Sequence, residues 1–387
     1  MKIEAWYSLN FESRLTGRYI TLSHINPLLE KYENSFAISS LGVSELGKTI
    51  HLLKIGNGSK NVLAWSQMHG NETTTTKSLF DFLKFISQKE AFQSEIKDFL
   101  NNYSLYLIPM LNPDGASLYT RENSNLVDLN RDAQDLSQKE SKVLRAIFEE
   151  LRPKLCLNLH DQRSIFGLES GQPASISFLS PAADNERTIT SSRKKAMEYI
   201  VAMNARLQNH IPDQIGRYDD SFNENCVGDS FQMAGVPTIL FEAGHIGNDY
   251  SREKTREYIF YSLLDLFDIT RNAVAKPNHN DYFLIPENIK CYKDFILRNI
   301  LLNDLDEPIS IAIQYSEELR DAAIIFIPEI VEIGDLTEFI GHIDIDAKGA
   351  KVLVNSQNNI RVGDKVSIIV NKKDESLIYF NQNDLSF

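Results

Sequence analysis

Apolar residues in the first part of the chain fall into short strand-like runs that alternate with segments of helical spacing. The run 61–68 is typical of a buried strand, and the segment 73–87 carries apolar residues three and four positions apart. A second helical segment at 91–100 leads to another strand at 103–110. Strand, helix and strand at this spacing predict a βαβ unit and a largely parallel sheet, in which functional residues gather at the carboxyl ends of the strands.

The same alternation continues to about residue 270. The further strands that we expect are 154–159, 175–180 and 236–241, and the further helices are 137–151, 185–209 and 252–270. We therefore predict an α/β fold, a mixed and largely parallel sheet flanked by helices, for a first domain at 1–275.

The last quarter of the chain has a different pattern. A polar, proline-containing stretch at 276–281 is typical of a linker, and short alternating segments separated by Gly, Asn and Asp follow it. We predict that residues 282–387 form a small, mainly β domain.

Composition narrows the class of protein. The chain has 387 residues, of which 42% are hydrophobic and 24% charged, as in a globular protein. No run approaches the roughly 20 apolar residues of a membrane helix, and the first twenty residues lack the apolar core of a signal peptide. The formal net charge of -13 opposes binding to nucleic acid. The three cysteines have no metal-type spacing and no disulfide framework, so we expect a cytoplasmic protein with no membrane or nucleic-acid partner.

Chemistry first appears where the strand at 61–68 gives way to a helix. His69 and Glu72 stand three residues apart there, so both side chains can reach one ion. Such a pair is common by chance, but two later predicted strands end in His160 and Glu242. Two histidines and a carboxylate suit a catalytic zinc ion with a fourth position open for water. A separate carboxylate must then move the water's proton, and Glu242 is our candidate.

In this arrangement the chain resembles the zinc carboxypeptidase superfamily, which includes digestive carboxypeptidases, murein-peptide amidases and the aspartoacylase and succinylglutamate desuccinylase branch. The resemblance covers about residues 60–250 and rests on an ordered set of motifs. The motifs are His69-Gly-Asn-Glu72, Asn112-Pro-Asp-Gly115, Arg121, Asp128-Leu-Asn130-Arg131, His160 and Glu242.

The resemblance implies a role for each matching residue. His69, Glu72 and His160 would hold one zinc ion, and Glu242 would act as general base and then general acid. Arg121 would polarise the scissile carbonyl, because a guanidinium keeps its charge. The substrate carboxylate would be bound by Asn130 and Arg131, and Tyr218 resembles a mobile tyrosine that some members place over the substrate.

Four residues allow a second interpretation. Arg131 could instead form a salt bridge with a neighbouring aspartate, and Tyr218 could be an ordinary surface residue. Asp229 has either a role in the substrate pocket or none, and His245 is better explained as a structural neighbour of Glu242 than as a ligand.

The sequence therefore predicts an enzyme, a zinc metallocarboxypeptidase that hydrolyses an amide bond next to a free carboxylate in short peptides. The alternatives are an N-acyl amino acid deacylase that uses the same residues and an inactive zinc-binding module. Asn71 stands where digestive members of the family have an arginine, which alters the expected recognition of long peptides. The substrate is either a short peptide or an N-acyl amino acid, and no sequence signal indicates an oligomeric state.

Overall fold

The computed structural model describes residues 2–269, 277–302 and 307–384. Its larger part is built on an eight-stranded mixed sheet in which the central strands β4, β3, β5 and β9 run parallel to one another. In sheet order the strands are β1 (Ala37–Val43), β2 (Thr49–Ile55), β4 (Tyr103–Ile108), β3 (Lys60–Ser66), β5 (Leu155–Asp161), β9 (Thr238–Ala243), β7 (Ile176–Leu179) and β8 (Ile215–Arg217). The α/β prediction is confirmed.

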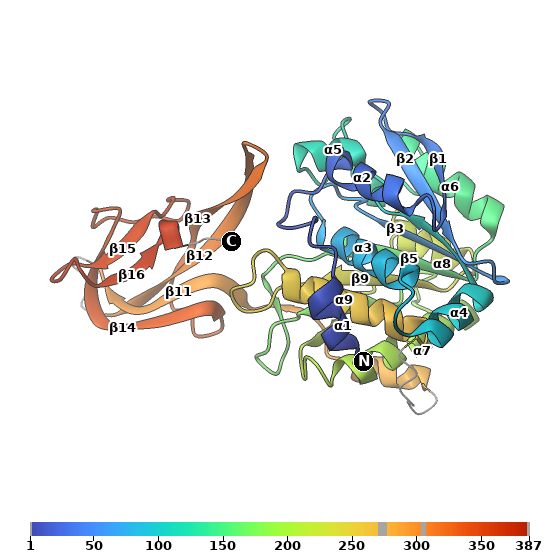
Figure 1. Ribbon diagram of the computed structural model, residues 1–387. Helices are drawn as coiled ribbons and strands as arrows, with labels where there is room; N and C mark the ends of the chain where they lie inside the picture. Colours follow the sequence, from blue (N-terminus) through green and yellow to red (C-terminus); the bar gives the residue numbers. More distant parts are fainter. Residues whose placement is uncertain (1, 270–276, 303–306, 385–387) are drawn as a thin grey trace.

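Helices cover both faces of this sheet (Figure 1). One face packs against α1 (Ile3–Asn10), α2 (Leu22–Tyr32), α3 (Thr74–Ser87), α4 (Gln93–Asn102), α7 (Ser191–Leu207) and α9 (Glu253–Leu266), and the other against α6 (Lys139–Leu151) and α8 (Val227–Met233). Strand β3 shows why both faces are covered. Its residues alternate between two cores, with Val62 and Ala64 in the first and Leu63 and Trp65 in the second. A strand that is buried on both faces reads as a continuous apolar run.

Two polar segments that are not among the expected helices contain short helices. The Asn-Pro-Asp-Gly turn opens α5 (Pro113–Leu118), because the Asn112 side chain accepts a hydrogen bond from the Gly115 N–H and caps the helix. The polar stretch at 216–236 likewise contains α8, whose Phe231 stacks on Phe148 of α6 at a centroid distance of 3.8 Å. Tertiary packing therefore stabilises a helix that the polar composition of this segment does not predict.

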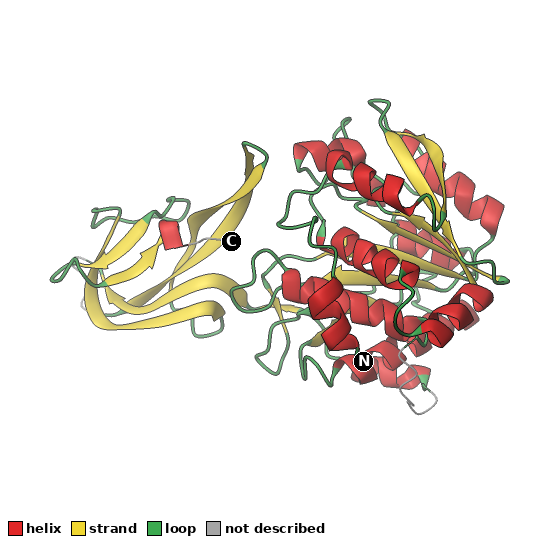
Figure 2. Cartoon of the chain, in the orientation of Figure 1, coloured by secondary structure: helices red, strands yellow, loops and turns green. Residues whose placement is uncertain are grey.

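The C-terminal part is a six-stranded sheet, visible as a separate lobe in Figure 2. Its strands, in sheet order, are β13 (Ala323–Gly334), β12 (Ile309–Arg320), β11 (Tyr292–Leu301), β14 (Ile340–Val354), β15 (Ile368–Asn371) and β16 (Ile378–Asn381). All neighbours are antiparallel except β11 and β14. The mainly β character is confirmed, although we expected no strand at the position of β11.

The expected end of the first domain at residue 275 lies outside the described residues. The described part of the predicted linker enters the 3-10 helix η2 (His279–Leu284), and Tyr282 of this helix is buried in the core of the large sheet. A two-stranded pairing of β10 (Ile289–Lys290) with β6 (Phe166–Gly167) follows. The division into domains at 1–275 and 282–387 stays a prediction, and we use the names catalytic and C-terminal domain for the two parts.

Side chains from both domains contact each other around Tyr250. Tyr250, in the loop after β9, is buried within the core of the C-terminal sheet and donates a hydrogen bond of 2.9 Å to Asp294. The hairpin of β12 and β13 rises beside the catalytic domain (Figure 1).

Within the part of the chain that the structure describes, no helix is long and apolar enough to cross a membrane.

Candidate metal centre and adjoining cavity

The candidate ligands come from the carboxyl ends of two neighbouring parallel strands. His160 lies near the carboxyl end of β5, where it is in register with Glu242 of β9. His69 and Glu72 lie in the loop between β3, the other neighbour of β5, and α3. Since parallel strands end at the same edge, residues far apart in the sequence meet there.

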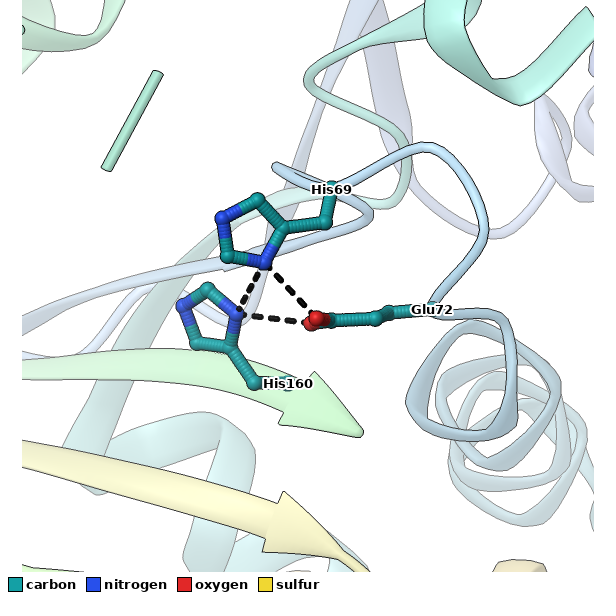
Figure 3. Close-up of side chains that lie close together, drawn as sticks. All are labelled: His69, Glu72 and His160. Carbon is teal, nitrogen blue, oxygen red and sulfur yellow. Dashed lines mark hydrogen bonds and ion pairs between the residues drawn. The ribbon is translucent and has the colours of Figure 1, made fainter. Parts of the chain in front are cut away.

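The side chains of His69, Glu72 and His160 point toward one another (Figure 3). The Nδ1 atoms of the two histidines each lie 2.8 Å from a Glu72 carboxylate oxygen and 3.1 Å from each other. One ligand atom from each residue falls within 4.8 Å of the others. Both imidazoles are 2% exposed, so water has little access to them.

A second layer of polar groups orients this cluster. His69 turns its other ring nitrogen, Nε2, toward Asp128 Oδ1 at 2.9 Å. Arg121 donates from Nε to Asp128 Oδ2 at 3.0 Å and from a terminal nitrogen to Glu72 at 3.4 Å. A carboxylate on the far nitrogen of a histidine fixes its tautomer and leaves the near nitrogen free as a ligand. Asp128 therefore orients the His69 ring. The sequence placed Asp128 in the motif with Asn130 and Arg131 but gave no indication of this role.

Two local features hold Glu72 in position. Gly70 lies against the start of α5, where a Cβ atom would come within 2.0 Å of the Gly115 backbone, so only glycine fits. After Glu72, the Thr74 hydroxyl donates a hydrogen bond of 2.6 Å to the carboxylate of Asp161 at the end of β5. The Thr75 hydroxyl lies 2.8 Å from the hydroxyl of Ser66 in β3. The threonine run thus ties the start of α3 to both neighbouring strands.

Burial and the close packing of these groups shift their pKa values. Burial acts to lower the pKa of His69, but Glu72 and the hydrogen bond to Asp128 outweigh it and raise the pKa. For His160 burial prevails over Glu72, and the pKa is lowered. Burial also acts to raise the pKa of Glu72, yet the two histidines hold it well below its usual range. A carboxylate and a neutral imidazole are the forms that bind a metal ion.

These residues fit a zinc ion by their donor chemistry. Nitrogen and oxygen ligands in a set of two histidines and one carboxylate suit zinc, and the convergence of the two Nδ1 atoms on one carboxylate leaves their lone pairs facing a shared point. The partner of His69 on its outer nitrogen is the one expected for a ligating histidine.

Glu242 lies beside this cluster as a buried carboxylate that is 8% exposed, and its Oε2 atom has no hydrogen-bond partner among the described residues. Burial raises its pKa well above the usual range, and the charges of Glu72 and Asp161 raise it further. An unpartnered carboxylate with a raised pKa has the properties of a proton carrier.

The three residues expected to bind substrate surround the same edge of the sheet. Asn130 accepts a hydrogen bond from the Val227 N–H at 3.1 Å, while the exposed guanidinium of Arg131 bonds only to a backbone carbonyl within the described structure. Among the described residues it forms no salt bridge with an aspartate, which was the second interpretation. Burial raises the pKa of the partly buried Tyr218, and the charges of Glu242 and Glu72 add to this shift.

A cavity of about 530 Å³ opens beside the metal centre, between the two domains. Glu72 and Arg121 line it together with residues that sequence reasoning missed, among them two buried arginines, Arg18 and Arg252. Arg18 forms an ion pair of 3.2 Å with Glu317 of the C-terminal domain. Nothing in the local sequence of these residues marks them as part of a site, because only the domain contact brings them together.

His245, three residues after Glu242, makes contacts that stabilise the fold. His245 is buried, its Nε2 lies 2.7 Å from the Gly247 carbonyl, and its ring packs against Tyr250 and His342. Asp229 is also buried, which raises its pKa to about 7 beside Cys226 and Arg131.

The fold and the cluster define an α/β protein with a candidate His–Glu–His metal site. Residues 21–141 match the family model described as "Zinc carboxypeptidase", a stretch that contains His69, Glu72 and Arg121 and ends before His160 and Glu242. Human carboxypeptidase D is 27% identical over 121 residues, which are 27% of this chain and 9% of that protein. The chain thus spans less than a tenth of the length of this curated relative.

Solved structures show the same fold over a longer stretch. A metallo-carboxypeptidase from Burkholderia cenocepacia matches with a TM-score of 0.51 and 14% identity over 63% of this chain and 68% of its own. A metallo-carboxypeptidase from Pseudomonas aeruginosa matches with a TM-score of 0.51 and 17% identity over 64% of this chain and 69% of its own. The chain is therefore similar to zinc carboxypeptidases, in sequence over residues 21–141 and in fold over a longer stretch, and the metal that such a similarity implies is one zinc ion.

Proposed function

We propose that this protein is a zinc metallocarboxypeptidase that hydrolyses the amide bond next to a free carboxylate in short peptides. The observation that carries the proposal is the position of Glu242, a buried and unpartnered carboxylate, in register with His160 of the candidate metal cluster. A site that only stored a metal ion would have no use for such a group.

His69, Glu72 and His160 would hold the zinc ion, which would supply a Lewis acid that activates a water molecule for attack. Glu242 then accepts a proton from the attacking water and later donates it to the leaving nitrogen. Its raised pKa suits both steps, because the proton is held firmly enough to be carried and loosely enough to be passed on.

The remaining residues bind and orient the substrate. Arg121, fixed by its hydrogen bonds to Asp128, stabilises the negative charge that develops on the scissile carbonyl oxygen. Arg131 has an exposed guanidinium that can bind the terminal carboxylate in a bidentate manner, with Asn130 beside it. The structure from Pseudomonas aeruginosa is a complex with (2-guanidinoethylmercapto)succinic acid, a compound that contains the type of carboxylate we assign to this position. Tyr218 covers the bound substrate.

The test is product detection by mass spectrometry. The zinc-loaded protein and its Glu242→Gln variant are incubated with short peptides, murein-type peptides and N-acyl amino acids. We expect the wild type to release C-terminal residues, and the variant to keep its zinc while losing about 100- to 10,000-fold in rate. Cleavage confined to N-acyl amino acids would assign the protein to the deacylases, and activity retained by Glu242→Gln would remove this residue from the role of base.

A further inference from the structure

The cavity between the domains has two chemically different walls. The charged residues that the catalytic domain contributes include four arginines, Arg18, Arg121, Arg163 and Arg252. Those from the C-terminal domain are all acidic, and they are Asp294, Glu317 and Glu329. A ligand with a negative or carbonyl end and a positive end would therefore lie across the cavity in one direction.

Two of these carboxylates already have partners. Asp294 accepts hydrogen bonds from the Tyr250 hydroxyl at 2.9 Å and from the Tyr315 N–H at 2.7 Å. Glu317 is bound by Arg18 and by the hydroxyl of Tyr119. These contacts hold the hairpin of β12 and β13 against the catalytic domain.

Glu329 differs from both, because its partly buried carboxylate has no hydrogen bond or ion pair in the described structure. Its cross-strand neighbour is Gln314, which also lines the cavity and is 8% exposed. The Gln314 amide nitrogen donates to Asp294 and, at 2.8 Å, to Ser164. Its orientation is thereby fixed, and its buried carbonyl oxygen has no partner among the described residues.

A buried acceptor without a donor is costly, and a carboxylate beside it adds a negative charge. The group that satisfies both is a cation with several N–H donors. A protonated amine has three N–H donors and fits the pair of Gln314 and Glu329.

The position of the cavity indicates which amine this is. The cavity begins at Glu72 and Arg121, while Asn130 and Arg131 are not part of its lining. With the terminal carboxylate at Arg131 and the scissile carbonyl at Arg121, the N-terminal part of a peptide enters the cavity. Its free α-amino group then approaches the acidic wall.

We propose that Glu329 and Gln314 of the C-terminal domain bind the free α-amino group of a short peptide substrate, so that both ends of the peptide are recognised. This inference rests on the proposed function for the direction in which the peptide lies. It makes Glu329 a specificity-determining residue outside the metal-binding domain.

The experiment measures binding separately from cleavage. Di-, tri- and tetrapeptides of alanine and phenylalanine, each with a free or an acetylated amino terminus, are titrated by calorimetry into the zinc-loaded Glu242→Gln protein. At the peptide length that spans the cavity we expect the free amine to bind about 10-fold more tightly, as for a partly exposed charge-assisted hydrogen bond. Adding Glu329→Gln should reduce this preference to less than about 2-fold, and Glu329→Ala should do the same.

Glu338→Gln is the matched control, because it removes the same charge from an exposed position of the C-terminal domain that does not line the cavity. It should keep the full preference. The unfolding midpoint of each variant shows whether the domain is still folded. Equal binding of free and acetylated peptides at all lengths, binding of neither, or a preference that survives Glu329→Gln would overturn the inference.

The cleavage assay with wild-type protein separates this inference from the proposed function. Preferential binding of free amines by a protein that cleaves no peptide would support the amine site and refute the carboxypeptidase assignment. Peptide cleavage without any amine preference would do the reverse.

Discussion

The two sheets of this protein present their polar groups in different ways. In the large sheet the candidate metal ligands and Glu242 lie at or just beyond the ends of parallel strands, where the strand direction alone brings them together. In the C-terminal sheet the polar groups of the cavity lie on β11 and along the hairpin of β12 and β13, facing the other domain. The first arrangement follows from the topology of one domain, whereas the second exists only where two domains touch.

This difference separates the residues proposed for the reaction from those proposed to select the substrate. The metal cluster and Glu242 are all supplied by the catalytic domain, so the proposed reaction needs no group from the C-terminal sheet. The acidic wall adds groups that lie beyond Glu72 and Arg121 in the cavity. Changes in the two regions should therefore affect different measurements.

The largest effect is expected from His160→Ala. Loss of one of three ligands should weaken zinc binding by more than about 100-fold, since loss of an outer-shell partner alone typically weakens it by 10- to 100-fold. Zinc content after dialysis, measured by mass spectrometry, checks this. His51→Ala, which changes a partly buried histidine of β2 outside the cluster, should leave the content unchanged. An unchanged content in His160→Ala would mean that the third ligand is another residue.

Arg121→Gln should come next, with a loss of about 100- to 1,000-fold in kcat/KM at full zinc content, because one stabiliser of the developing oxyanion is removed. Arg163→Gln is its control. Arg163 lines the same cavity but is exposed, so its loss should cost less than about 10-fold. A similar loss in both variants would show that the cavity responds to total positive charge rather than to the position of Arg121.

Much of the metal site was accessible from the sequence for a physical reason. His69 and Glu72 are three residues apart, and His160 and Glu242 each end an apolar run that reads as a strand, so the local pattern carries the information. Their roles as ligands and base stay predictions, as do those of Asn130, Arg131 and Tyr218. The cavity wall had no such signal, because Glu317 and Glu329 look like ordinary polar positions of a β-strand.

The same reasoning explains what was missed in the fold. The short helices α5 and α8 depend on a side-chain cap and on a stacked pair of phenylalanines from separate segments, neither of which has a hydrophobic period of its own. The strand β11 was missed although its residues are buried, and its place at the centre of the C-terminal sheet depends on partners from 309–320 and 340–354. Pairing over such distances is set by the whole domain.

A pH effect should distinguish the interface from the metal centre. Burial raises the pKa of Asp294 to about 6, and the negative charge of Glu317 acts in the same direction. The hydrogen bonds that Asp294 accepts from Tyr315 and Tyr250 act to lower this pKa, but burial outweighs them. The folded state thus holds this proton more tightly than the unfolded state. The resulting stabilisation is complete below about pH 4 and is lost as the pH rises through about 6, with a total of about 3 kcal/mol.

Urea unfolding of the wild type and of Asp294→Asn between pH 4 and pH 7.5 measures this stabilisation. The variant cannot titrate at this position, so the difference in unfolding free energy between the two proteins should change with pH in the stated direction. A constant difference over the range would show that Asp294 keeps the same charge when folded and unfolded.

The smallest effect concerns the contact that holds the acidic wall in place. Arg18 is buried, and Glu317→Gln removes its ion-pair partner, but Glu317 itself is 25% exposed and solvent screens the pair. We expect a coupling free energy of about 1 kcal/mol between Arg18→Met and Glu317→Gln in a double-mutant cycle measured by urea unfolding. The exposed pair of Glu318 and Arg320 on the same strand is the control, and its coupling should stay below about 0.5 kcal/mol. Equal coupling in the two pairs would mean that the wall is held by the Tyr250 contact rather than by Glu317, and that Glu317 is free to serve the substrate instead.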